Sequence, residues 1–142
     1  MPVEFVDTNV LVYAYDSSAG PKQVIARGLV SRLWNEQCGA VSIQVLQEFY
    51  VTVIRKAPWP LDVAHARQVV VDLQQWRVAV PDVAAVLEAI DASERYRISF
   101  GDAMILTAVS RLGAGVAWSE EMSPGQAYGS VVVRNPFTSM GS

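Results

Sequence analysis

The chain has 142 residues, 51% of them hydrophobic, and a formal net charge of −3. This size and composition predict one soluble globular domain and exclude a disordered chain. The negative charge disfavours binding to nucleic acid through a basic surface, but it leaves open a contact made through a bound cation.

Hydrophobic periodicity predicts short β-branched strands that alternate with helices. In chain order, the expected elements are a strand at 3–6, a short helix or turn at 9–15, a helix at 22–37, a strand at 40–42, helices at 42 or 43–56 and 61–76, a strand at 77–80, helices at 82–95 and 102–112, and strands at 116–118 and 131–133. The helix at 102–112 is apolar nearly all round, so we expect it to be central. The alternation predicts an α/β fold with a mostly parallel central sheet. Residues 1–138 form the predicted domain, and 139–142 are a tail outside it.

Single copies of cysteine and histidine, Cys38 and His65, limit the available chemistry. An intrachain disulfide is excluded, which is typical of a reducing compartment. A zinc site built from several Cys and His ligands is excluded within one chain. The sequence shows neither a signal peptide nor a run of ~18 uncharged apolar residues, so we expect a cytoplasmic protein without a membrane span.

Acidic residues stand at the junctions between the predicted strands and helices. Asp7 follows the first strand, Glu48 lies on the helix after the second strand, and Asp102 opens the most apolar helix. Glu120 and Glu121 follow the strand at 116–118. In a right-handed parallel sheet these positions lie at one edge, so we expect the acids to meet in a crevice there.

Carboxylates gathered in a partly dry crevice repel one another, and some protonate unless a cation binds. An all-oxygen ligand set suits Mg²⁺ or Mn²⁺. Such a site hydrolyses phosphodiesters by polarising the phosphate and lowering the pKa of a bound water, without any histidine.

Each acid also has an ordinary structural explanation. Asp7 is suited to cap the helix that follows it, and the segment 99–102 matches a capping box. Glu48 lies on a helix, where most glutamates are solvated, and the pair 120–121 suits the first turn of a helix. The functional prediction therefore depends on all of these acids meeting at one edge.

Four segments, taken together, resemble the PIN-domain nucleases and most of all the VapC-type toxins of bacterial toxin–antitoxin pairs. They are Val6-Asp7-Thr8-Asn9-Val10-Leu11, Gln47-Glu48-Phe49, Phe100-Gly101-Asp102-Ala103 and Trp118-Ser119-Glu120-Glu121. The resemblance spans essentially the whole chain. In the last motif the family commonly has Thr or Ser, any residue, then Asp. Here Glu121 takes the Asp position with Glu120 beside it, so both glutamates are candidates for the fourth acid.

The resemblance implies a three-layer α/β/α fold and a Mg²⁺- or Mn²⁺-dependent endoribonuclease. It also implies a homodimer and an antitoxin partner that can place a basic side chain among the acids. The implied catalytic acids are Asp7, Glu48, Asp102 and Glu121, with Asp7 and Asp102 as the principal metal ligands. The implied supporting residues are Thr8, Asn9, Ser119 and Glu120. The hydroxyls of Thr8 and Ser119 would orient a metal-bound water, and Asn9 would hold the turn after the first strand.

Two other functions remain open. Asp7 could serve as the nucleophile of an aspartyl-phosphate phosphatase or phosphotransfer site. Such sites usually need a lysine near the phosphate, and Lys56 is expected at a helix end away from the acidic edge. A dehalogenase-type site would need a second Asp where Asn9 stands. The other alternative is a catalytically silent PIN fold that binds RNA or protein, although all four acidic positions are filled.

Overall fold

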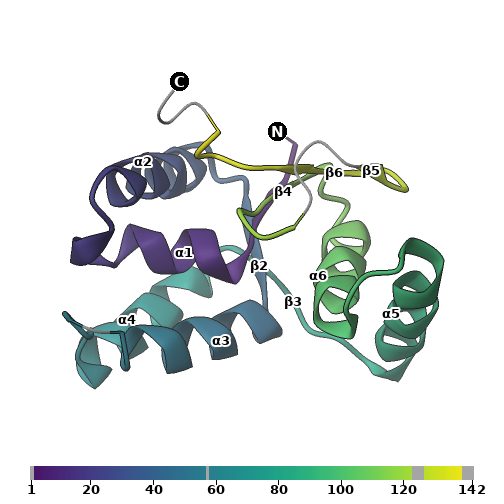
Figure 1. Cartoon of the computed structure of the whole chain (residues 1–142), viewed down its shortest axis with the longest axis horizontal. Helices are drawn as coiled ribbons and strands as arrows, with labels where there is room; N and C mark the ends of the chain where they lie inside the picture. The colour runs from purple at the N-terminus through teal and green to yellow at the C-terminus, as the bar shows by residue number, and fades with distance from the viewer. Residues whose placement is uncertain (1, 57, 123–126, 139–142) are drawn as a thin grey trace.

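The computed structural model describes residues 2–56, 58–122 and 127–138. In this part of the chain, six strands form one central sheet in the order β3-β2-β1-β4-β6-β5 (Figure 1). The strands are β1 Glu4–Val6, β2 Gly39–Ser42, β3 Arg77–Ala79, β4 Val116–Trp118, β5 Ala127–Tyr128 and β6 Val131–Arg134. All neighbouring pairs are parallel except β5 and β6, which form an antiparallel hairpin. The predicted, mostly parallel sheet is confirmed.

Helices cover both faces of the sheet. In Figure 1, α1 to α4 lie on one side of the strands, and α5 and α6 lie on the other, which gives three layers. The helices are α1 Thr8–Ala14, α2 Pro21–Glu36, α3 Ile43–Val53, α4 Val63–Leu73, α5 Val83–Tyr96 and α6 Phe100–Arg111, with a short 3₁₀ helix, η1 Ser17–Ala19. No helix in the described residues has the length and hydropathy needed to cross a membrane.

The helix boundaries follow from side-chain caps. Ser42, Asp62, Asp82 and Ser99 each accept a hydrogen bond from a backbone N–H in the first turn of α3, α4, α5 and α6, respectively. These bonds satisfy donors that have no partner inside the helix. Because Ser99 is the cap, α6 begins at Phe100, two residues before the predicted start.

The most apolar predicted helix is central, as expected. Six residues of α6 are buried: Ala103, Ile105, Leu106, Thr107, Ala108 and Val109. They pack where α6 lies between the sheet and α5, so the amino end of this helix is held firmly at the edge of the sheet.

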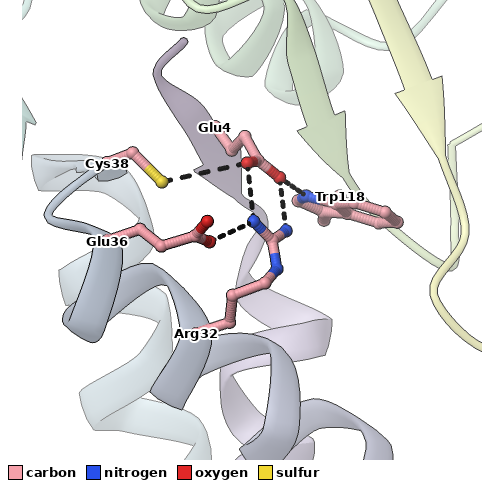
Figure 2. Close-up of polar contacts among 5 residues, drawn as sticks. All are labelled: Glu4, Arg32, Glu36, Cys38 and Trp118. Atoms are coloured by element: carbon pink, nitrogen blue, oxygen red, sulfur yellow. Dashed lines mark hydrogen bonds and ion pairs between the residues drawn. The ribbon is translucent and has the colours of Figure 1, made fainter. Parts of the chain in front are cut away.

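A polar cluster fixes β1 against its neighbours (Figure 2). Glu4, at the start of β1, accepts two hydrogen bonds from Arg32 of α2, at 2.7 and 3.0 Å, and one from the indole N–H of Trp118, at 2.8 Å. Arg32 also donates to Glu36 at 2.8 Å. The hydrogen bonds from Arg32 hold the pKa of Glu4 below its ordinary value. The cluster ties α2 to β1 and β4, and therefore supports the strand that carries Asp7.

Gly39 offers a test of core packing. A Cβ added at this position would lie 2.6 Å from the ring of Trp76, which is itself 7% exposed and packed against Trp34. We expect Gly39→Ala to lower the free energy of unfolding by ~1–3 kcal/mol because the buried indole must move. Urea denaturation of the purified protein measures this change.

Gly28 supplies the matched control. It lies inside α2, and an added Cβ meets no atom within 4 Å. Gly28→Ala should stabilise the protein by ~0.5–1 kcal/mol because alanine loses less backbone entropy in a helix. If Gly39→Ala and Gly28→Ala change the free energy of unfolding by the same amount, the close contact between position 39 and Trp76 is contradicted.

Candidate active site

A cleft of about 330 Å³ opens where β1 and β4 end, between α1, α3 and α6. The lining residues come from segments far apart in the sequence. They include all four predicted catalytic acids, Asp7, Glu48, Asp102 and Glu121. The four acids therefore line one cleft at one edge of the sheet, as the sequence predicted.

Asp7 is fixed by three donors around its carboxylate. The Thr8 N–H donates to Oδ1 at 2.7 Å. The Ser119 hydroxyl and the Asn9 side-chain amide donate to Oδ2 at 2.9 and 3.3 Å. The carboxylate is 7% exposed and also caps α1. Asp7 therefore both caps α1 and lines the cleft, so the two explanations of this residue are not alternatives.

The electrostatics of Asp7 disfavour its charged form. Burial raises the pKa of its carboxyl to about 6, against the lowering effect of the hydrogen bonds from Ser119 and Thr8. The negative charges of Glu48 and Asp102 contribute to this rise in the pKa. A buried acid among other acids is a position where a cation would be strongly favoured.

Glu48 and Asp102 reach the cleft from two different helices. Glu48 lies on α3, and its Oε2 is 3.5 Å from the Thr8 hydroxyl. Asp102 is the third residue of α6, and its backbone N–H donates to Ser99 Oγ at 3.1 Å. The capping role of Ser99 is therefore present, while the carboxylate of Asp102 lines the cleft.

Only one of the two adjacent glutamates after β4 lines the cleft. Glu121 does so, whereas Glu120 forms an ion pair with Lys22 and accepts a hydrogen bond from the Tyr13 hydroxyl at 2.7 Å. Although burial raises the pKa of Glu120, the bonds from Lys22 and Tyr13 bring it below the ordinary value. Their positions thus differ, where the sequence had placed Glu121 at the family's Asp position but left Glu120 as an alternative for the fourth acid.

Asn9 and Ser119 link α1 to the loop after β4. The Asn9 side chain accepts from the Glu120 N–H at 3.0 Å and donates toward Ser119 Oγ at 3.5 Å. Ser119, which is fully buried, also accepts from the Met122 N–H at 3.2 Å. These contacts place both residues as supports of the carboxylate of Asp7.

A model of the PIN domain matches residues 5–121. The chain belongs to the PIN domain family.

The fold of this PIN domain is also found in solved structures of toxins. A toxin–antitoxin complex from Klebsiella pneumoniae has a TM-score of 0.69 and 15% identity, over 94% of this chain and 97% of that chain. VapC20 of Mycobacterium tuberculosis, a sarcin–ricin loop cleaving toxin, has a TM-score of 0.61 and 19% identity, over 80% and 86%. DNA-bound VapBC of Salmonella typhimurium has a TM-score of 0.65 and 15% identity, over 96% and 99%. At these identities the likeness shows the fold alone. No curated protein sequence matches the chain.

The expectation that Lys56 lies away from the acidic edge is wrong. Lys56 lines the cleft of this PIN domain, together with Gln44, Glu48 and Thr52. Gln44, Glu48 and Thr52 follow one face of α3, and Lys56 lies three residues beyond the end of that helix. The regular spacing of four residues was the available signal, but Lys56 was assigned to a surface away from the acidic edge. The placement removes one objection to aspartyl-phosphate chemistry, whereas Asn9 still stands where a second Asp would be needed.

The donor set of this PIN domain suits a hard divalent ion. The cleft offers carboxylate oxygens, among them the buried carboxyl of Asp7. Within the described ranges, no three Asp, Glu, His or Cys side chains lie close enough to form a ready metal-binding group. Mg²⁺ usually binds through one or two carboxylates and keeps several waters, so this looser arrangement fits it. Asp7 and Asp102, which the family resemblance implies as the principal ligands, are among the lining acids that could hold such an ion.

Proposed function

We propose that this PIN domain is a Mg²⁺- or Mn²⁺-dependent endoribonuclease. The observation that carries the proposal is the meeting of Asp7, Glu48, Asp102 and Glu121 in one cleft. A divalent ion held there would polarise the phosphate of the substrate and lower the pKa of a bound water, and phosphodiester hydrolysis needs both effects.

The chain's own side chains would prepare the site. Ser119 and Asn9 hold the carboxylate of Asp7 in one orientation. The Thr8 hydroxyl lines the cleft at 3.5 Å from Glu48 Oε2, where it can orient a water molecule. Positioning of this kind lowers the barrier because the reacting groups need no rearrangement.

We further propose that the protein is the toxin of a toxin–antitoxin pair. The support is the fold shared with the Klebsiella complex, the Salmonella VapBC and the RNA-cleaving VapC20. An acidic cleft is also suited to receive a basic side chain of an antitoxin, which would block it. The likeness to VapC20, a sarcin–ricin loop cleaving toxin, supports RNA as the substrate. The homodimer that the family resemblance implies is also proposed as the working assembly.

The neighbouring residues Glu120 and Glu121 provide the experiment. Wild-type protein should cleave single-stranded RNA with Mg²⁺ or Mn²⁺ and stop in excess EDTA. Glu121→Gln should lower kcat by ~10–100-fold because it removes a charge from the cleft. Glu120→Gln should cost much less, since Glu120 is engaged by Lys22 and Tyr13. Gel-based rate measurements at saturating RNA give these values.

Two results would count against this assignment. Cleavage that persists at the full rate in EDTA would contradict metal dependence. A larger loss with Glu120→Gln than with Glu121→Gln would show that the fourth acid is the other glutamate.

A further inference from the structure

We propose that Lys56 binds a phosphate of the RNA backbone that flanks the cleaved bond. This inference rests on the proposed function. Among the described residues that line the cleft, Lys56 alone is basic, and four of the others are acidic. A polyanion that enters such a cleft is repelled by its walls unless a cationic group offers a contact.

The contacts of Lys56 suggest which phosphate it meets. Lys56 follows the end of α3 and pairs with Asp16, which lies beyond the carboxyl end of α1, whereas Asp7 caps the amino end of α1. Glu48 lies beside Thr8 and Asp7, where the chemistry is proposed. Lys56 is therefore displaced along the cleft from the reacting phosphate, and its contact is with a neighbouring one.

Asp16 acts as a positioning residue for this lysine. Its carboxylate is 6% exposed and is fixed by the N–H and hydroxyl of Ser18, at 2.9 and 2.5 Å. Although burial raises the pKa of Asp16, the bonds from Ser18 and the charge of Lys56 bring it below its ordinary value. A charged, immobile carboxylate thus stands beside a flexible lysine at the end of the cleft.

The Asp16–Lys56 pair leaves the ammonium available. The Nζ–Oδ2 distance is 3.6 Å, and the Lys56 side chain is 35% exposed. An ammonium group has three donors, so it can contact a phosphate while it stays close to Asp16. Lys22, the only other lysine, pairs with Glu120 and lies over the ring of Tyr13. The two lysines therefore have different tasks.

The test measures RNA binding and cleavage separately. Binding of a fluorescent single-stranded RNA of mixed sequence is measured in an Asp102→Asn background, which is expected to bind without cutting. Cleavage is measured with Asp102 intact. Lys56→Met should raise both Kd and KM by ~10-fold, the scale of one charge-assisted contact, with a much smaller change in kcat. Lys56→Arg should restore most of the affinity.

Salt dependence separates a phosphate contact from a structural role. Each neutralised phosphate contributes ~0.7 to the slope of log affinity against log salt for a single strand, so Lys56→Met should reduce that slope by ~0.7. The matched control is Arg55→Met, which removes the same charge one residue away. Arg55 is exposed and does not line the cleft.

Asp16→Asn tests the positioning role. It should weaken RNA binding by a smaller factor than Lys56→Met, and this loss should disappear when Lys56 is already methionine. Such non-additivity is expected of two residues that act through one contact.

Distinct results overturn the inference and the proposed function. A Lys56→Met protein that binds RNA with unchanged Kd and salt slope, or that behaves like Arg55→Met, overturns the role of Lys56. A wild type that binds RNA through Lys56 but never cleaves it contradicts the nuclease and supports the contact. Absence of any RNA binding by the wild type overturns both.

Discussion

Asp102→Asn and Asp7→Asn should each reduce metal-dependent RNA cleavage by ~10²–10³-fold or more. Each substitution replaces a charged oxygen by a neutral amide in the cleft where the ion is proposed to bind. Asp102 is half-buried on the first turn of α6, so its loss should leave the fold intact. Single-turnover cleavage with excess enzyme measures the effect, and sequencing of RNA ends in cells that express each variant identifies the lost cuts.

The matched control is Asp62→Asn. Asp62 is exposed, caps α4 and lies outside the cleft lining. Asparagine caps a helix about as well as aspartate, so this variant should fold and cleave like the wild type. If Asp7→Asn and Asp102→Asn both cut RNA at the rate of Asp62→Asn, the cleft is not the catalytic site.

Much of the fold follows from local pattern. The alternation of β-branched runs with helical spacing correctly predicted strands β1 to β4, strand β6 and helices α2 to α6, and it left α1 as a short helix or turn. The pattern could not indicate β5, which has two residues, Ala127–Tyr128, and exists because it pairs with β6 across a turn at Gly129. So short a strand has too little periodicity to be recognised and depends on its partner.

The candidate site was predictable to the level of the sheet edge. A parallel sheet places its strand ends together, so Asp7 and Glu121 could be assigned to one crevice from topology alone. Topology does not say which way a side chain points within a loop. The choice between Glu120 and Glu121 as the fourth acid therefore stayed open in the sequence, and the contacts of Glu120 with Lys22 and Tyr13 separate the two residues only in three dimensions.

Lys56 escaped prediction for a related reason. A helix that starts at a sheet edge runs away from it, so its far end was assigned to another surface. Here Gln44, Glu48 and Thr52 of α3 line the cleft, and Lys56, three residues beyond the end of this helix, lines it as well. Helical spacing that continues from a functional residue is thus a usable signal for further members of a site.

Asp7 combines a structural role with a cost to stability. Its carboxylate caps α1 and accepts three hydrogen bonds, yet burial near Glu48 and Asp102 makes its charge unfavourable. The fold alone does not require a buried acid at the end of a hydrophobic strand. Locally unfavourable groups of this kind are typical of functional sites, which is why their removal often stabilises a protein.

The stability of the metal-free protein should therefore depend on pH through Asp7. The pKa of Asp7 is about 6 in the folded chain, against an ordinary value of 3.8 for this carboxyl group, so the folded state binds the proton more tightly. The stabilising contribution of the protonated carboxyl is complete below pH 3.8 and is lost as the pH rises through about 6. The shift corresponds to a loss of at most ~3 kcal/mol in the free energy of unfolding.

Asp7→Asn isolates this contribution because other titrating groups cancel in the difference between the two proteins. Urea unfolding in EDTA measures the free energy of unfolding of both proteins. Its value for the variant, relative to the wild type, should rise by up to ~3 kcal/mol between pH 4 and pH 7. The stability difference between the two proteins at any single pH also includes a change in the hydrogen bonds from Asn9 and Ser119, because these donors meet an amide instead of a carboxylate in the variant. At pH 7, Mg²⁺ should then stabilise the wild type more than the variant, since only the wild type offers the full ligand set. A stability difference that stays constant across this pH range would show that Asp7 is ionised in the folded protein at no cost.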